Sequence, residues 1–302
     1  MATVILKTNL PNLIHRGKVR DMYDLGDYLL MVATDRLSAF DVVLPDGIPN
    51  KGAMLAQMSA FWFEQTAHII PNHIVAMGYE TDKLARLNIP DAFKKLMPDI
   101  ARRSAVVRKA RRVDVECVVR GYITGSAWAE YKKSGTISGE PAAKGLQESQ
   151  MFPKPIFTPT TKAEVGHDEN ISFEETVKLA GDRKTAEALR DKTIAVYEFA
   201  RDFASKRGII IADTKFEFGF IDGKLCLIDE VLTPDSSRFW DVEGYKIGVS
   251  QPSYDKQIVR DWLTQSGWNK EPPGPKLPDA IIERTAQRYQ EAFERLTGRK
   301  LK

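Results

Sequence analysis

The chain has 302 residues, of which 43% are hydrophobic and 28% charged, which indicates a folded globular protein of one or two domains and not a disordered chain. Its 44 basic and 41 acidic residues leave a net charge of +3, too balanced for a nucleic-acid-binding protein. The apolar runs have the length of strands, and the N-terminus lacks a basic region followed by a long apolar core. We therefore expect a cytoplasmic protein that binds no membrane.

The first 115 residues have the pattern of an antiparallel β-sheet. Strands are predicted at 19–25, 28–34, 104–110 and 113–119, the first two joined as a hairpin by a Gly-Asp turn. Cys117 lies in the last of these strands and Cys226 in a later one. Because neither belongs to a CxxC or zinc-type spacing, both are predicted to be small core residues.

Three helices are predicted from apolar spacing and capping residues. The first packs one stripe on this sheet, formed by Met54, Leu55, Met58, Phe61 and Trp62. The second region begins with a capping box at Ser172 and Glu175 and continues to a helix that Gly208 ends, with the stripe Val196, Phe199 and Phe203. The last follows a proline-rich break and carries Ile282, Tyr289, Phe293 and Leu296.

A dense basic cluster lies within and on both sides of the third predicted strand. Its members are Arg102, Arg103, Arg108, Lys109, Arg111 and Arg112. Because no aromatic residues alternate with them to stack bases, we interpret the cluster as a solvated strand face and not as a nucleic-acid site.

Two glycine-containing segments are candidates for phosphate binding, since the chain has neither a GxxxxGK[ST] nor a GxGxxG motif. Lys18 and Arg20 lie on one face of a predicted hairpin that could cover a triphosphate. Arg120 offers a bidentate fork, and the glycines before Ser126 would let backbone N–H groups approach a phosphate. A strand followed by a plain turn fits the second segment as well.

The stretch from residue 209 to residue 241 places charged residues where apolar strands end. After the apolar run 209–211, alternation puts Asp213, Lys215 and Glu217 on one face of a strand. The opposite face carries Thr214, Phe216 and Phe218.

A second apolar strand, 225–228, follows the turn signal at 222–223 and runs directly into Asp229 and Glu230. Carboxylate oxygens and a fixed cation brought to one place are what a magnesium-nucleotide site needs. A salt-bridged surface hairpin fits the same spacing, so these residues alone leave both interpretations open.

Together with four earlier segments, this stretch resembles the SAICAR synthetase family over most of the chain. The segments are GKVRDMYDL (17–25), ATDRLSAFDVVLPDGIPNKG (33–52), VECVVRGYITGSAWAEY (115–131) and FTPTTKAEVGHDENIS (157–172), and the stretch itself ends in DEVLTPDSSRFWD. The resemblance implies an α+β fold of two lobes, similar to ATP-grasp and kinase-like enzymes. A β-rich antiparallel lobe would span residues 1–115 and an α+β lobe residues 116–302, with ATP between them.

The resemblance also implies an activity. Members join 5-aminoimidazole-4-carboxylate ribonucleotide (CAIR) to L-aspartate, giving SAICAR, ADP and phosphate through an acyl phosphate, in de novo purine biosynthesis. ATP and Mg²⁺ would be the cofactors, the partners would be small molecules, and we expect a monomer. Because phosphorylation supplies the leaving group, positioning and electrostatics would suffice without a nucleophilic side chain.

Site residues follow from the resemblance, position by position. Those implied in catalysis are Lys215, Glu217 and Asp229, and the last two would hold the metal. Those implied in nucleotide binding are Gly17, Lys18, Arg20, Val115, Glu116 and Val118, with 115–118 as the connection on which adenine stacks. Those implied in substrate binding are Arg120, Ser126, Asp168, Asp235, Ser237 and Arg238. Matched positions without an assigned role are Ser38, Asp41, Lys51, Lys162 and His167, and no catalytic role is expected for His68 or His73.

The register of the hairpin decides whether Glu217 and Asp229 meet. A two-residue loop at 222–223 would oppose Glu217 to Ile228 and leave Asp229 on the other face. A three-residue loop, or a bulge, would oppose Glu217 to Asp229. Because a joint metal site needs both carboxylates, we predict the latter.

Two other functions are weighed against this one. A kinase-like phosphotransferase would share the β-rich lobe, but the chain lacks the HRD and DFG signatures. A nucleic-acid-binding or regulatory nucleotide-binding module would account for the basic cluster. It would not need Lys215, Glu217 and Asp229 together.

Overall fold

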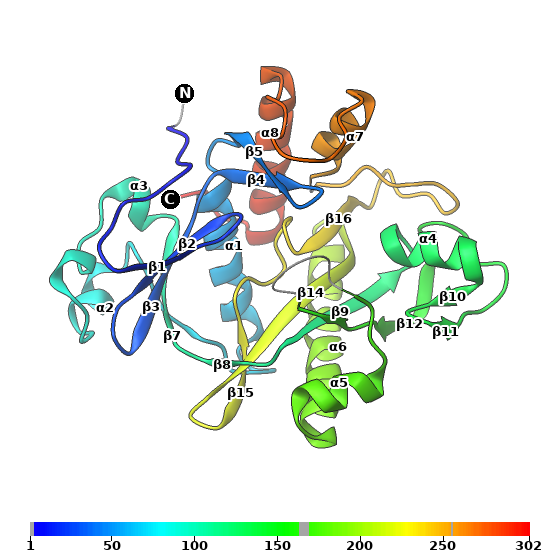
Figure 1. Cartoon of the computed structure of the whole chain (residues 1–302), viewed down its shortest axis with the longest axis horizontal. Coiled ribbons are helices and arrows are strands. Elements are labelled where there is room, and N and C mark those ends of the chain that lie inside the picture. Colours follow the sequence, from blue (N-terminus) through cyan, green and yellow to red (C-terminus); the bar gives the residue numbers. More distant parts are fainter. Residues whose placement is uncertain (1–2, 163–168, 255) are drawn as a thin grey trace.

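The computed structural model describes residues 3–162, 169–254 and 256–302, which form two main antiparallel sheets with helices between and around them (Figure 1). The first sheet has the strand order β1-β2-β3-β7-β6. Its strands are β1 Leu13–Arg16, β2 Arg20–Asp24, β3 Tyr28–Ala33, β6 Ile74–Met77 and β7 Ser104–Arg108. The pairing of β2 with β3 confirms the predicted hairpin.

The second sheet is built around β14, a 13-residue strand, in the order β12-β9-β14-β15 with shorter strands paired beside it. Its strands are β8 Arg111–Arg112, β9 Val115–Tyr122, β12 Met151–Phe157, β13 Thr160–Thr161, β14 Ile209–Ile221, β15 Lys224–Ile228 and β16 Ser237–Asp241. Two small sheets pair β4 Arg36–Ala39 with β5 Val42–Gly47, and β10 Thr136–Ile137 with β11 Glu140–Pro141. The chain crosses from the first main sheet to the second between β7 and β9.

The helices surround and separate these sheets (Figure 1). They are α1 Lys51–Thr66, α2 Thr81–Ala85, α3 Pro98–Ala101, α4 Gly125–Ser134, α5 Phe173–Ala180, α6 Arg183–Ser205, α7 Gln257–Gln265 and α8 Asp279–Thr297, with a 3₁₀ turn at Asp91–Phe93. In the described part of the chain, none is both long and apolar enough to cross a membrane.

Helix α1 is the predicted first helix, but the expectation of a single buried stripe is wrong. The helix packs on β3, β6 and β7 and also on α8, so side chains all around it are buried. Met58 and Trp62 belong to the largest apolar cluster, together with Val196 of α6 and Phe216 of β14. The segments before and after residue 115 therefore share one core.

The other predicted helices are present. Ser172 Oγ accepts a hydrogen bond from the backbone N–H of Glu175, whose carboxylate accepts one from the backbone N–H of Ser172, so the capping box is confirmed. Helix α6 ends at Ser205, three residues before Gly208, which has the positive φ of 72° expected of a helix-terminating glycine. Tyr289 and its apolar neighbours in α8 are buried.

The basic cluster is mostly at the surface, as predicted, with one exception. Arg108 and Arg112 are exposed and form ion pairs with Asp222 and Asp114. Arg103, by contrast, is fully buried, with its Nη1 2.7 Å from Asp35 Oδ1. The interpretation as a solvated face is therefore wrong for Arg103, which lies in the turn between α3 and β7 and directs its side chain toward Asp35 and the start of α1. Both cysteines are buried, as predicted.

Candidate active site

Strand β14 presents the two faces that its alternation predicts. Phe216 and Phe218 are fully buried, whereas Lys215 and Glu217 are partly accessible on the opposite face. The strand pairs with β9 and β16 along its first part and with β15 along its last. Charged side chains from β9, β14 and β16 therefore gather on one face of the sheet.

The predicted register of the β14–β15 hairpin is wrong. The loop is the two-residue turn Asp222-Gly223, and Glu217 lies opposite Ile228. Asp222 and Gly223 have φ values of 49° and 73°, and positive φ at both central positions matches the twist of two-residue hairpins. The carboxylates nevertheless approach each other, because Asp229 leaves the strand with a φ of 66°.

Arg20, from β2 of the first sheet, reaches the acids that follow β15. Its Nη2 is 2.6 Å from Asp229 Oδ2, and its Nη1 is 3.7 Å from Glu230 Oε2. Burial disfavours the guanidinium charge, but the surrounding carboxylates outweigh it and raise the pKa of Arg20. Burial also opposes ionisation of Asp229, yet Arg20 holds the pKa of that carboxyl below its ordinary value. The two sheets are thus joined electrostatically at this point.

Glu217 is a partly buried acid whose charge the surrounding groups disfavour. Burial raises the pKa of Glu217 to about 7, and the nearby Asp229 carboxylate adds to the effect, while Lys162 opposes it. Lys162, which follows β13 and had no assigned role, forms an ion pair with Glu217, and its Nζ is 3.4 Å from Glu116 Oε1. Two neighbouring carboxylates, one of them with a raised pKa, fit a divalent cation, since Mg²⁺ uses one or two carboxylates together with substrate phosphates. Within the described residues no cluster of three or more metal-ligating side chains occurs.

Lys215 contacts Glu116, which was predicted to lie in the connection on which adenine stacks. Its Nζ is 2.8 Å from Glu116 Oε2, and its side chain is 46% exposed. Glu116 and its neighbours lie inside β9, whose backbone pairs with β13 on one side and β14 on the other. The expectation that 115–118 connects the lobes is therefore corrected, because the chain passes from the first sheet to the second at residues 109–110, between β7 and β8.

A second charged cluster lies around Asp213, four residues before Glu217 in β14. Asp213 is opposite both Arg120 of β9 and Arg238 of β16, and it forms ion pairs with both. Arg120 also donates from Nε to Thr158 Oγ1 at 3.0 Å and from Nη2 to Ser126 Oγ at 3.2 Å. No role was predicted for Asp213 from the sequence. Its carboxylate nevertheless orients both arginines, because Asp213 lies between them in the sheet.

Glycine is required at positions 121 and 125 for two different structural reasons. A Cβ on Gly125 would lie 2.5 Å from Arg238 Nη2, and Gly125 has a φ of 57°, so this glycine allows the arginine to approach. Gly121 was interpreted as admitting a phosphate. A Cβ there would instead lie 1.8 Å from the Tyr197 hydroxyl, which donates to the carbonyl of Ile211. Packing of α6 therefore explains Gly121.

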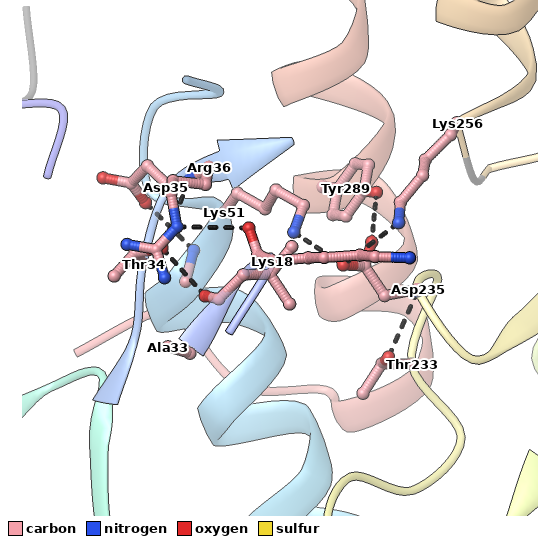
Figure 2. Close-up of polar contacts among 12 residues, drawn as sticks. Lys18, Ala33, Thr34, Asp35, Arg36, Lys51, Thr233, Asp235, Lys256 and Tyr289 are labelled. Atoms are coloured by element: carbon pink, nitrogen blue, oxygen red, sulfur yellow. Dashed lines mark hydrogen bonds and ion pairs between the residues drawn. The ribbon is translucent and has the colours of Figure 1, made fainter. Parts of the chain in front are cut away.

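Asp235 lies in a buried ionic network, shown in Figure 2. Its Oδ2 is 2.7 Å from Lys51 Nζ and 3.5 Å from Lys256 Nζ, and its Oδ1 accepts a hydrogen bond of 2.7 Å from the Tyr289 hydroxyl. Burial opposes ionisation, but the two lysines hold the pKa of Asp235 well below its ordinary value. Ser237, two residues on, donates from Oγ to Thr214 Oγ1 at 2.8 Å. Lys256 and Tyr289 carried no sequence signal of such a contact.

The loop before β2 is held by an arginine that the sequence did not single out. Arg36 donates to the carbonyl of Lys18 at 3.1 Å and to that of Gly17 at 2.9 Å. The Lys18 ammonium is 2.6 Å from Asp41 Oδ1, and both side chains are exposed. A lysine paired only at the surface is accessible to an incoming anion.

Other residues considered in the sequence lie in β4, in the packed interior or outside the described residues. Ser38 lies in β4, and Asp168 and His167 lie outside the described residues. His73 is buried in ring contact with Phe63, and burial lowers its pKa to about 4. The expectation that it has no catalytic role stays a prediction.

The chain is similar to known SAICAR synthetases over nearly its whole length. The model of the SAICAR synthetase family matches residues 13–275. The phosphoribosylaminoimidazole-succinocarboxamide synthases of Thermodesulfovibrio yellowstonii and Geobacter sulfurreducens are each 52% identical, with 99% of this chain and 100% and 99% of those proteins covered. The SAICAR synthase of Saccharomyces cerevisiae, solved in complex with SAICAR, superposes with a TM-score of 0.86 at 44% identity, covering 98% of this chain and 99% of that one. A type-2 SAICAR synthetase in complex with ADP gives a TM-score of 0.67 at 25% identity, over 95% and 99%.

Proposed function

The chain belongs to the SAICAR synthetase family, and from its charged clusters we propose where each substrate of the reaction binds. It is an ATP-dependent ligase that joins CAIR to L-aspartate in purine biosynthesis. One observation carries the proposal. The connection from Asp229 to Arg238 joins the acidic cluster around Glu217 (the acidic end) to the arginine cluster around Asp213 (the arginine end), four residues earlier in β14.

The acidic end is proposed to bind the triphosphate with its metal. Glu217 and Asp229 would hold Mg²⁺, which would neutralise phosphate oxygens during transfer. Arg20 forms ion pairs with Asp229 and Glu230, and Lys18 is exposed on the loop before it, so both cations are placed to contact phosphates. Lys162 and Lys215 supply further positive charge within the same cluster. The ADP complex of a family member supports a nucleotide site in this fold.

The arginine end is proposed to bind the ribonucleotide. Arg120 and Arg238 both form ion pairs with one buried carboxylate, Asp213, which holds two guanidinium groups close together. Ser126 and Ser237 add hydroxyl groups at the same place. Phosphate and carboxylate groups are the ligands that paired guanidinium forks recognise.

The chemistry is proposed to pass through an acyl phosphate. A carboxylate does not react with an amine while oxide is its leaving group, so the CAIR carboxylate would first attack the γ-phosphorus, releasing ADP. The amine of aspartate would then attack the acyl carbon, lose a proton and expel inorganic phosphate. The cations of both clusters would screen the repulsion between carboxylate and triphosphate and hold them in line.

An oxygen label tests the route. CAIR carrying oxygen-18 in its carboxylate is expected to transfer one labelled atom to phosphate per turnover, because that oxygen leaves with the phosphoryl group. Unlabelled phosphate accompanied by amide formation would exclude the acyl phosphate.

Substitution of Arg120 tests the placement of the two sites. Arg120→Ala is expected to weaken CAIR binding by about 2–5 kcal/mol, the cost of removing a buried partner from an anion, with ATP affinity nearly unchanged. Calorimetric titration with each ligand measures both. Arg108→Ala, at the exposed tip of the sheet, is the matched control and should change neither. Loss of ATP binding with CAIR binding intact would show that the two sites are interchanged.

A further inference from the structure

We propose that Tyr289, in the C-terminal helix α8, positions the ribonucleotide-binding segment Thr233–Arg238 through its hydrogen bond to Asp235. The inference rests on the proposed role of Arg238 in binding the ribonucleotide. It gives α8 a part in the reaction although this helix contributes no residue to either charged cluster.

The contact is buried and brings together distant parts of the chain. Tyr289 is 1% exposed, and its hydroxyl is 2.7 Å from Asp235 Oδ1. The other oxygen, Oδ2, lies 2.7 Å from the ammonium of Lys51, at the start of α1, and 3.5 Å from that of Lys256, beside α7. The Lys51 ammonium also lies over the Tyr289 ring, 5.9 Å from its centroid. Figure 2 shows these side chains converging on the one carboxylate.

The segment between Asp235 and Arg238 is rigid enough to transmit a displacement. The carbonyl of Thr233 accepts hydrogen bonds from the backbone N–H groups of Ser236, at 3.1 Å, and Ser237, at 2.8 Å. The backbone N–H of Asp235 donates to Thr233 Oγ1 at 3.2 Å. Ser237 then enters β16, and Arg238 lies opposite Asp213. A shift of Asp235 therefore moves the start of β16, and the guanidinium of Arg238 with it.

The composition of the network favours positioning over stabilisation. A buried carboxylate with its cations gains little over apolar packing of the same volume, because all the charges must be desolvated. What a buried carboxylate and its partners provide instead is a single, defined arrangement of the segments that carry them. Here that geometry fixes a turn that ends at a proposed ligand contact. Of the groups around Asp235, the Tyr289 hydroxyl can be removed without removing a charge, so Tyr289→Phe tests the contact at constant charge.

The experiment compares two tyrosines whose hydroxyls anchor α8. Tyr289→Phe is expected to raise the KM for the ribonucleotide about three- to tenfold, because one hydrogen bond to a charged group is lost. The kcat and the KM for ATP should change less than about twofold on the same reasoning. Tyr254→Phe is the matched control: Tyr254 is also 1% exposed, and its hydroxyl bonds Asp241 at 3.1 Å and Glu291 of α8 at 2.9 Å, away from the 233–238 segment. It should lower the melting temperature without changing the KM for the ribonucleotide.

Arg238→Ala, measured in parallel, distinguishes failure of the positioning role of Tyr289 from failure of the proposed ribonucleotide site. If it raises the KM for the ribonucleotide while Tyr289→Phe does not, the positioning role is overturned and the binding site stands. A rise in KM that is equal for Tyr289→Phe and Tyr254→Phe, or equal for ATP and ribonucleotide, would also overturn it, since a general loss of structure explains that result. An Arg238→Ala enzyme with unchanged KM for the ribonucleotide would overturn both proposals.

Discussion

Glu217 is predicted to destabilise the folded protein at neutral pH, so that Glu217→Gln yields an inactive but more stable enzyme. Burial, together with Asp229, raises the pKa of Glu217 to about 7 from an ordinary 4.5. Between these values the folded state binds a proton that the unfolded state has lost, so the free energy of unfolding falls as pH rises through this window. A glutamine in its place has no proton to lose and escapes this penalty.

The magnitude follows from the size of the shift. A shift from 4.5 to about 7 corresponds to an upper limit of about 3.4 kcal/mol, at about 1.4 kcal/mol per pKa unit. The Glu217 side chain is 15% exposed and pairs with Lys162, so solvent and the lost ion pair reduce the gain. We expect the variant to be about 1–3 kcal/mol more stable than the wild type at pH 8, with little difference near pH 5. Turnover should be abolished, because a metal carboxylate is worth about 3 kcal/mol or more in the transition state.

Urea denaturation at pH 5 and pH 8, without magnesium or nucleotide, measures the effect. Glu116→Gln is the matched control, because Glu116 lies on the adjacent strand and contacts Lys162 and Lys215. Removing it takes a partner from two lysines, so that variant should be less stable than the wild type at pH 8. The reasoning is refuted if Glu217→Gln is no more stable than the wild type at pH 8, or if its stability changes with pH as much as that of the wild type.

Two further predictions concern residues around the site. Burial lowers the pKa of His73 to about 4 from 6.5, so on acidification the unfolded state binds a proton first and the free energy of unfolding falls through that window. Between pH 7 and pH 5 the free energy of unfolding of His73→Gln should fall by about 2 kcal/mol less than that of the wild type. Urea denaturation at the two pH values measures this, and equal decreases for both proteins would contradict it. Gly121→Ala should destabilise by about 1–3 kcal/mol, because its Cβ displaces the Tyr197 hydroxyl. Gly244→Ala, where a Cβ would meet nothing within 4 Å, is its control, and equal melting temperatures for the two variants would contradict the packing argument.

The local elements could be predicted from the sequence because their causes are local. The alternation of Lys215 and Glu217 with Phe216 and Phe218 decides which face of β14 is buried, since successive side chains of a strand point to opposite sides. The capping box at Ser172 needs only a residue three positions away. The ordered motifs likewise identified the family, which comparison of the whole chain then confirmed.

The tertiary structure alone decided which charges meet. Whether the hairpin had two or three loop residues depended on the dihedral angles of Asp222 and Gly223, and a shift of one residue reverses the face of every side chain. Arg20 and Asp229 are 209 residues apart, and Lys51 and Asp235 are 184 apart. No periodicity in the sequence spans such separations. These pairs exist because packing of the two sheets around α1 and α8 brings together segments whose own patterns specify only a strand, a turn or a helix.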